Sequence, residues 1–487
     1  MKKLVLVLLL LPTLLAAQNN NVQKFINKTL QKDSLFQNSL TGILVMDDTD
    51  KVVAQWNADI PMMTASTMKT ITTGAALQIL GPDYRYKTTL AYTGEIQDSI
   101  LNGNLIIIGE GDPTFGSRDT IATPIEEIFG RWADAVKALG IKEVKGYILG
   151  DDTYFTHEII PGTWSWYNLG EYYGSGTSGL NYCENVQYFT IKPGAQVGDK
   201  VEITNIEPFI PEMQYHNECL TGEPDSGNNT LYIVSDLAKT SINAGTLEID
   251  RDSLVADFSN KFPDVTCAWA FKEFLKGAGV VCNDTIPEYE DLQVSECSVK
   301  TIAENYSCPL IDIVYVTNKI SNNFFAETML KTIAKKVKGV GSYDSAYVAM
   351  EEFIRGKGLS TTGYDQLDGS GLARRNNVTP RFFCKFYKMM EEYEGFEEYV
   401  ATFPVPGMPG TAKYVLRNEP LSFKSRIHAK SGTLSGVRAY AGYVDGATVK
   451  NKYRFAILVN NFPVSTSKMQ PNVEAFLKEL AIYAEKH

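Results

Sequence analysis

Histidine is scarce in this sequence. Only four histidines occur among 487 residues, and no Gly-x-Ser-x-Gly elbow accompanies any of them. A Ser-His-Asp hydrolase therefore has no supporting motif, and we expect the histidines to be structural or surface residues. They are His157, His216, His428 and His487.

The cysteines lack Cys-x-x-Cys and metal-ligand spacings, so the sequence indicates neither a metal site nor a dithiol redox centre. In an exported chain some of them can pair, and their odd number leaves at least one unpaired or intermolecular. Six lie between residues 183 and 308, so any disulfides would cross-link that region. The sequence does not give their connectivity. The seven cysteines are Cys183, Cys219, Cys267, Cys282, Cys297, Cys308 and Cys384.

A long hydrophobic run is absent after the first 17 residues, so no later segment is expected to cross a membrane. At the start, Lys2 and Lys3 precede an apolar run from Leu4 to Leu15, followed by the small residues Ala16 and Ala17. A buried N-terminal helix would show polar positions on one face. We therefore predict a signal peptide over residues 1–17 and an exported, soluble protein, with the periplasm as the expected location.

An excess of positive charge is also absent. The formal net charge is −11, which argues against nucleic acid as a partner because phosphate binding requires a basic surface. The length and the 44% hydrophobic content are typical of a globular protein with two to four domains. We find no internal repeat and no low-complexity tract.

The expected secondary structure changes twice along the chain. Residues 85–299 are rich in short alternating strands separated by turns, with one clear helix over 124–139. Before and after them, helical patterns and a late hairpin-rich sheet dominate. We therefore predict one domain from residues 18–84 plus 300–487, with residues 85–299 inserted as one or two β-rich modules. The expected helices outside the insertion are 66–80, 310–318, 324–337, 343–356, 379–392 and 473–486, and the expected strands lie in 41–55, 425–434, 437–444 and 453–460.

One candidate catalytic pair lies where the first of these helices begins, in TASTMKTITTG (64–74). Ser66 and Lys69 are three positions apart and share a helix face. A neutral amine can remove the proton of a serine hydroxyl and make it a nucleophile. Burial and the positive helix N-terminus both disfavour the ammonium form, so Lys69 is suited to activate Ser66.

This pair alone is weak evidence. Ser66 would also be an ordinary helix cap, and a second Ser-x-x-Lys match occurs at Ser465 and Lys468. Two further short elements change the interpretation. They are Ser321-Asn322-Asn323 and the single Lys-Ser-Gly element, Lys430-Ser431-Gly432 on a late strand, where the glycine would leave room for a ligand backbone.

Together, in this order, the three elements resemble the active-site motifs of penicillin-recognising acyl-transfer enzymes. Asn323 follows Lys69 by 254 positions, too far for an ordinary β-lactamase. This spacing is similar to the class C low-molecular-mass penicillin-binding proteins, a D-Ala-D-Ala carboxypeptidase and endopeptidase family with extra domains between the first two elements. The stretches GEGDPTF (109–115), GDDTYF (150–155), PGTWSWYNLGEYYGSGTSGLNYCENV (161–186) and DGSGLARRNNVTP (368–380) resemble the same family.

The resemblance implies an α/β (α+β) fold with a penicillin-recognising serine transpeptidase-like domain, in which an antiparallel sheet is flanked by helices. It implies that Ser66 attacks the carbonyl between two D-amino acids while Lys69 takes the serine proton. Ser321 and Lys430 would relay a proton to the leaving amine, and Asn323 would hold the substrate amide. No metal or cofactor is required.

The same resemblance implies the binding residues. Hydroxyls of Ser431 and Thr433, on either side of Gly432, would bind the terminal carboxylate, and backbone N–H groups of Ser66 and Thr433 would form the oxyanion hole. Ser431 stands where threonine is usual in the family, which keeps the hydroxyl.

Two further residues correspond to family positions that contact the free end of the diamino-acid side chain of a peptidoglycan stem. Arg374 would pair with its carboxylate and Asp151 with its ammonium; neighbouring Asp152 is the alternative to Asp151. The implied partners are peptidoglycan stem peptides, with β-lactams as covalent inhibitors.

Two rival functions stay open from the sequence. A serine β-lactamase or esterase of the same superfamily would differ in how fast the acyl-enzyme is hydrolysed, but the long insertion and the lack of an obvious extra base argue against it. A non-catalytic wall-binding scaffold is disfavoured because every catalytic position carries a competent residue. The balance between carboxypeptidase and endopeptidase activity, the stem diamino acid and the oligomeric state are not given by the sequence.

Overall fold

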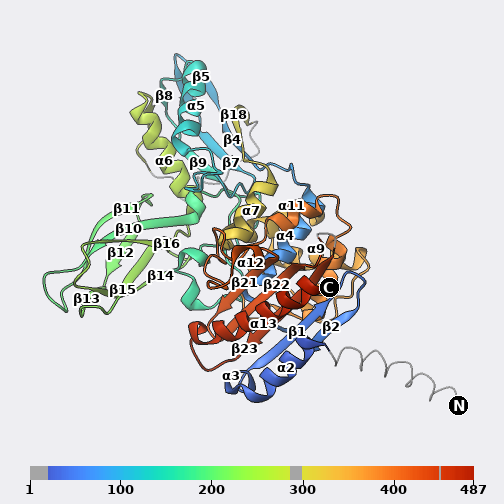
Figure 1. Cartoon of the computed structure of the whole chain (residues 1–487). Coiled ribbons are helices and arrows are strands. Elements are labelled where there is room, and N and C mark those ends of the chain that lie inside the picture. Colours follow the sequence, from blue (N-terminus) through green and yellow to red (C-terminus); the bar gives the residue numbers. More distant parts are fainter. Residues whose placement is uncertain (1–19, 286–298, 449–450) are drawn as a thin grey trace. The chain divides into compact units, whose positions relative to one another are not determined.

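The computed structural model describes residues 20–285, 299–448 and 451–487 (Figure 1). The predicted signal peptide and Cys297 lie outside this part of the chain. The chain divides into two compact units, the first formed by residues up to Pro82, Ile311–Leu330 and Tyr347–His487. The second unit is formed by Asp83–Leu310 and Lys331–Ala346, so residues 300–310 and 331–346 group with the insertion rather than with the sheet domain.

A five-stranded antiparallel sheet forms the centre of the first unit, in the order β2-β1-β23-β22-β21. The N-terminal strand β1 pairs along its whole length with β23 near the C-terminus, so both ends of the chain build one sheet. The strands are β1 (Leu40–Met46), β2 (Val52–Trp56), β21 (Ile427–Leu434), β22 (Val437–Asp445) and β23 (Lys452–Asn460).

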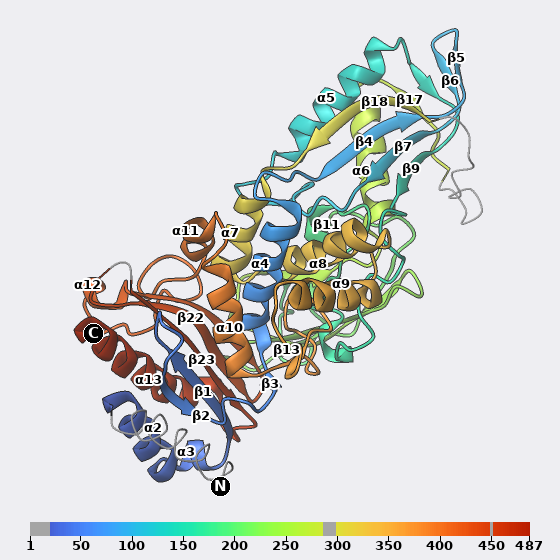
Figure 2. The same cartoon turned by 90° about the vertical axis from the view of Figure 1, so that its right-hand side faces the viewer.

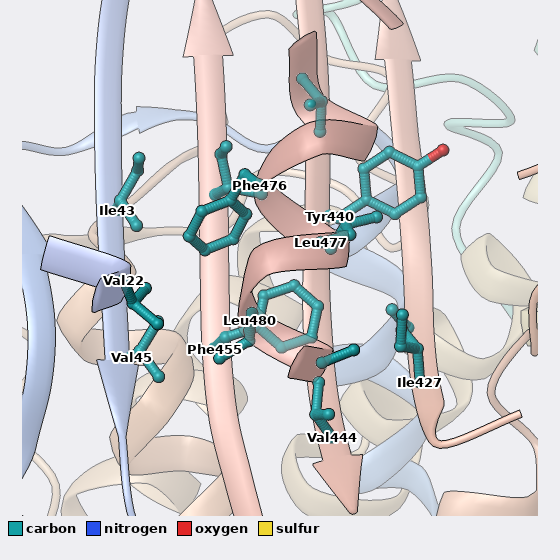
Figure 3. Close-up of a cluster of buried hydrophobic side chains, with 14 of the residues drawn as sticks. Val22, Ile43, Val45, Ile427, Tyr440, Val444, Phe455, Phe476, Leu477 and Leu480 are labelled. Carbon is teal, nitrogen blue, oxygen red and sulfur yellow. The ribbon is translucent and has the colours of Figure 1, made fainter. Parts of the chain in front are cut away.

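Helices cover both faces of this sheet (Figure 2). Helices α2 (Asn21–Lys32) and α13 (Thr466–Lys486) pack on one face, and α10 (Pro380–Met390) packs on the other. Side chains of a strand alternate between the two faces. In β1, the alternation sends Ile43 and Val45 into the core shared with α2 and α13 (Figure 3), and Leu44 and Met46 into a cluster with Cys384 of α10. The predicted antiparallel sheet flanked by helices is confirmed.

The short Ser-x-x-Lys element lies at the start of a helix of the first unit. A 3₁₀ turn, η1 (Ala65–Thr67), leads directly into α4 (Met68–Leu80), and Gly81 ends α4 with a positive φ of 90°. A small sheet of β3 (Met62–Met63), β19 (Tyr364–Asp365) and β20 (Asn377–Val378) lies nearby in the same unit. The other helices are α3 (Ser34–Gln37), α7 (Leu310–Ile320), α8 (Asn323–Lys338), α9 (Tyr343–Gly356), α11 (Phe396–Ala401) and α12 (Leu421–Lys424).

The second unit contains two hydrophobic cores. The first core is built on the sheet β18-β4-β7-β9 with helices α5 (Ile125–Ala138) and α6 (Pro263–Gly277), and Phe129, Trp132 and Phe271 are buried at its centre. A second four-stranded sheet, β17-β8-β6-β5, also contributes buried residues to this core. The strands are β4 (Lys87–Tyr92), β5 (Glu95–Gln97), β6 (Ile100–Asn102), β7 (Leu105–Gly109), β8 (Glu143–Val144), β9 (Ile148–Asp151), β17 (Val281–Cys282) and β18 (Lys300–Tyr306).

The second core of this unit is built from strands and the loops that join them. Phe189, Tyr232 and Phe258 are buried in it, between a three-stranded sheet, β11-β10-β16, and a four-stranded sheet around β15. Two separate cores fit the expectation of a β-rich insertion. These strands are β10 (Val186–Lys192), β11 (Glu202–Glu207), β12 (Gln214–Asn217), β13 (Leu220–Gly222), β14 (Asn228–Val234), β15 (Thr240–Glu248) and β16 (Leu254–Ser259).

The structure differs from the sequence-based expectation in its helices and in its cysteines. Helices α2, α3, α6, α11 and α12 were not predicted, and α13 begins at Thr466 rather than at residue 473, with Pro471 inside it. No disulfide joins the six described cysteines, so they do not staple the insertion. In the described ranges, no helix combines the length and the apolar character needed to span a membrane.

Candidate active site

Ser66 and Lys69 are in direct contact at the start of α4. Ser66 lies in the 3₁₀ turn η1, and its hydroxyl does not cap the helix. Instead, Ser66 Oγ lies 2.9 Å from Lys69 Nζ. The Lys69 side chain is fully buried. Burial lowers the pKa of Lys69 to about 7, although the carboxyl groups of Glu327 and Asp368 act in the opposite direction.

The surroundings of Lys69 Nζ determine how a neutral amine would be oriented. Besides Ser66 Oγ, the nitrogen lies 2.6 Å from Asn323 Oδ1 and 2.9 Å from the carbonyl oxygen of Ser370. Both of these oxygens can only accept hydrogen bonds. A neutral amine that donates its two N–H bonds to them keeps its lone pair for the hydroxyl proton of Ser66.

Two glycines make room for the turn that carries Ser66. A Cβ on Gly371 would lie 1.9 Å from the carbonyl oxygen of Ala65, and a Cβ on Gly432 would lie 2.6 Å from the carbonyl oxygen of Thr64. The Gly432 Cβ would also lie 3.1 Å from the backbone nitrogen of Ser66. A side chain at position 432 would therefore collide with residues 64–66, while β21 remains the edge strand of its sheet, so the space expected along this strand for a ligand backbone stays a prediction.

A second lysine–serine pair lies on the neighbouring elements. Lys430 Nζ on β21 donates to Ser321 Oγ at 2.8 Å and to the carbonyl oxygen of Ser431 at 3.0 Å. Burial lowers the pKa of Lys430 well below its ordinary value, and the positive charges of Lys69 and Arg438 lower it further. Ser321 connects α7 to α8 in the left-handed region, with φ of 67°, two positions before Asn323. The three predicted elements are thus brought together within the first unit.

The other predicted binding residues differ in their placement. Ser431 is buried and Thr433 is exposed on β21. The exposed Arg374 donates from Nη2 to the carbonyl oxygen of Ser435 at 2.8 Å, in the turn that follows β21. Asp151 belongs to the second unit, where its Oδ1 accepts from the backbone and hydroxyl of Thr153. Its role toward a substrate therefore stays a prediction.

Two buried carboxyl groups near Lys69 were missed by sequence reasoning. Glu327 on α8 accepts from the backbone N–H of Gly369 and Ser370 at 2.9 and 2.8 Å, and so holds the loop whose Ser370 carbonyl contacts Lys69. Burial and the nearby Asp368 carboxyl raise the pKa of Glu327 to about 8. A signal was present, because Glu327 follows Asn323 by four positions and thus lies on the same face of a helix.

Asp368 organises the other end of this loop. Its Oδ1 accepts from the backbone N–H of Gly371 at 2.7 Å, and its Oδ2 accepts from the backbone N–H of Ala373 at 2.5 Å. Asp368 is also the first residue of the DGSGLAR stretch, so its position in the motif could have identified it. Across the described ranges, no cluster of three or more histidine, cysteine or acidic side chains is arranged to hold a metal ion.

Comparisons with known proteins identify the family. The family model of D-Ala-D-Ala carboxypeptidase 3 (S13) matches residues 22–481. The D-alanyl-D-alanine carboxypeptidase of Actinomadura is 28% identical over 456 residues, covering 88% of this chain and 79% of that protein. The D-alanyl-D-alanine carboxypeptidase DacB of Haemophilus influenzae is 25% identical over 436 residues, covering 87% of each chain.

Solved structures agree with these sequence relatives in fold. The crystal structure of penicillin-binding protein 4 from Haemophilus influenzae matches with a TM-score of 0.79 and 23% identity, covering 96% of this chain and all of that chain. A structure of the same protein complexed with a β-lactam matches with a TM-score of 0.76 and 22% identity, covering 96% of this chain and 99% of that chain. With a family model that spans almost the whole chain, this protein belongs to the D-Ala-D-Ala carboxypeptidase 3 (S13) family of serine-type D,D-peptidases.

Proposed function

We propose that Ser66 forms an acyl-enzyme with the penultimate D-Ala of a peptidoglycan stem peptide. Ser66 Oγ attacks the carbonyl carbon, the C–N bond breaks, and the D-amino acid beyond it leaves as an amine. Water then hydrolyses the ester and releases the shortened stem. The contact between Ser66 and the buried Lys69 carries this proposal, because it pairs a hydroxyl with an amine whose pKa of about 7 makes it a base at neutral pH.

Two lysines divide the proton transfers. Lys69 accepts the hydroxyl proton as Ser66 attacks. Lys430, through the hydroxyl of Ser321, delivers a proton to the leaving amine. The separation of 2.8 Å between Lys430 Nζ and Ser321 Oγ supports this relay.

Backbone and side-chain groups around Ser66 bind the rest of the substrate. The N–H groups of Ser66 and Thr433 stabilise the oxyanion, an effect worth about 3 kcal/mol for each donor. The hydroxyls of Ser431 and Thr433 bind the carboxylate of the leaving residue, and Asn323 holds the substrate amide. The close approach of Gly432 to the Ser66 turn supports this assignment, because it sets β21 directly beside the nucleophile.

The stem side chain is recognised by a separate pair of residues. Arg374 binds the carboxylate at the free end of the diamino acid, and Asp151 binds its ammonium, with Asp152 as the alternative acid. The sequence of residues 1–17 supports export to the periplasm, where this substrate occurs.

The experiment that tests this function is incubation with labelled benzylpenicillin followed by intact-mass measurement. We expect a stable adduct on Ser66 in the wild-type protein and none in Ser66→Ala. Rapid turnover of the drug without a persisting adduct would instead indicate a β-lactamase, and no reaction would indicate a scaffold. Release of D-Ala from a stem pentapeptide, compared with cleavage of a cross-linked dimer, then separates carboxypeptidase from endopeptidase activity.

A further inference from the structure

Arg438 on β22 has a guanidinium that is half-buried and has no acidic partner. Its Nε donates to Gln470 Oε1 at 2.6 Å, Nη1 donates to Thr433 Oγ1, and Nη2 donates to the hydroxyl of Tyr440. All three acceptors are neutral oxygens. Within the described ranges, no carboxylate lies at ion-pair distance from this guanidinium, although buried cations in proteins are usually paired.

An acid on the adjacent helix is bonded to other groups. Glu474 of α13 accepts from Gln470 Nε2 at 2.6 Å with Oε1 and from the backbone N–H of Leu416 at 3.1 Å with Oε2. Gln470 therefore separates the cation from the anion. Its carbonyl oxygen orients the Arg438 guanidinium, while its amide group occupies the Glu474 carboxylate.

The pairing of β21 with β22 places Arg438 beside the hydroxyls of Ser431 and Thr433, the proposed substrate-binding groups. Ser431 and Thr433 lie opposite Tyr440 and Arg438 in the antiparallel pairing of β21 with β22. Residues two apart in a strand share a face, so the two hydroxyls and the guanidinium lie on the same face, and Lys430 points to the other. The Tyr440 ring packs in the core beneath α13 with its hydroxyl at the edge of the cluster (Figure 3).

The hydrogen bond from Arg438 also determines the direction of the Thr433 hydroxyl. Because Thr433 Oγ1 accepts from Nη1, its own O–H is left to donate. A hydroxyl donor beside a guanidinium matches two oxygens of one carboxylate.

We infer that Arg438 is a carboxylate-recognition residue, which binds the carboxylate of the D-amino acid on the leaving side of the scissile bond together with Thr433. This inference rests on the proposed function and adds a cation to a subsite otherwise made of hydroxyls. The carboxypeptidase substrate carries this group on its leaving D-Ala, and a cross-linked substrate carries it when the cross-link runs through the D-centre of a diamino acid.

Binding of this carboxylate has a consequence for proton transfer. The positive charge of Arg438 is one of the causes that lower the pKa of Lys430. A carboxylate at Arg438 offsets that charge, so substrate binding favours the protonated Lys430 that the leaving amine requires. The same contact thus selects the substrate and prepares the acid.

The test uses two D-alanyl thioesters that differ only in charge. In one the leaving group is mercaptoacetate, and in the other it is mercaptoacetamide; a thiolate leaves without needing a proton, so the pair reports recognition alone. For Arg438→Gln we expect kcat/KM for the acid to fall by about 10- to 100-fold and that for the amide by less than about 3-fold. Arg438→Lys keeps the positive charge but loses the planar guanidinium that can donate two parallel hydrogen bonds. We expect its ratio of kcat/KM for the acid to kcat/KM for the amide to be intermediate.

The control is Arg417→Gln, which removes one charge from an exposed arginine of the same unit and should change neither rate. Equal losses on both thioesters, or no loss, would show that Arg438 only supports the hairpin. If Arg438→Gln reacts with neither substrate, a wild-type ratio in Arg438→Lys overturns the inference. Failure of the wild-type protein to acylate at Ser66 would instead refute the proposed function.

Discussion

Lys69 shows how a buried side chain can act as a base at neutral pH. Its side chain is fully buried, and its amine lies within hydrogen-bond distance of two oxygens that can only accept hydrogen bonds. The Ser-x-x-Lys spacing and the expected burial predicted the Ser66–Lys69 contact. The opposing carboxyl groups, Glu327 and Asp368, were not predicted, although the four-residue spacing of Glu327 from Asn323 and the place of Asp368 in the DGSGLAR stretch were signals for them.

The lowered pKa of Lys69 predicts how acylation depends on pH. Acylation of Ser66 requires neutral Lys69, and the amine loses its extra proton as the pH rises through about 7. We therefore expect kcat/KM for benzylpenicillin acylation to rise between pH 6 and 8 with a midpoint about 7, measured by stopped-flow or quenched mass spectrometry. In Lys69→Met, we expect this rise with pH to disappear together with most of the acylation rate. A rate that falls over this range would contradict the role of Lys69 as base.

Glu327 holds the loop beside Lys69 through two backbone hydrogen bonds. Glutamine in its place has one oxygen for two backbone donors, so its amide group opposes the N–H of Gly369 or Ser370. We expect Glu327→Gln to lose about 1–3 kcal/mol of unfolding free energy and to acylate at least about 10-fold more slowly. Urea unfolding and penicillin acylation measure the two effects. The exposed Glu398→Gln is the control, and equal behaviour of the two variants would remove Glu327 from the support of Lys69.

At the scale of elements, the close approach of a loop and a strand to the Ser66 turn decides the geometry of the nucleophile. Gly371 has φ of 83°, and a Cβ there would lie 1.9 Å from the Ala65 carbonyl oxygen. We expect Gly371→Ala to slow acylation by about 100-fold or more, since displacement of a catalytic group by about 1 Å is enough for such a loss. Gly130→Ala in α5, where the added Cβ meets no atom, should acylate normally and gain about 0.5–1 kcal/mol in stability. Similar acylation by both variants would show that the turn tolerates the shift.

The elements themselves were largely predictable from periodicity. The strands of the late hairpins and helices 310–318, 324–337 and 343–356 were found within a few residues of their observed ends. Helix α6 was missed because its own apolar side chains point in several directions. Cys267 and Phe271 are buried, while Trp269 and Phe274 also contact neighbouring rings. Such a helix lacks the polar face on which the 3.6-residue pattern depends.

At the scale of the whole molecule, buried lysines govern how stability depends on pH. Burial lowers the pKa of Lys69 and of Lys261 in the second unit to about 7, and that of Lys430 well below 10.5. An unfolded lysine titrates near 10.5, so between these values the unfolded chain binds more protons than the folded chain. Stability should therefore rise with pH from about 7 to 8.5, by up to about 1.4 kcal/mol per pH unit for each lysine.

Urea unfolding at several pH values checks this dependence. Lys261→Met removes one of the titrating groups outside the candidate site, so its slope against pH should be smaller while Ser66 still acylates. Stability that declines across this window would contradict the neutral state of the buried lysines. Glu327 acts against the trend below pH 8, because its folded-state pKa of about 8 lies above that of the unfolded chain.

The pairing of β1 with β23 has a consequence for how the protein is made. Strand β1 can pair only after β23, which lies more than 400 positions later in the sequence, has been synthesised. During synthesis, the residues around Ser66 emerge long before the sheet against which they are held. Loop closure over such a distance is slow, so the catalytic unit should mature only after the last strand arrives, and the nascent chain would depend on holding factors until then.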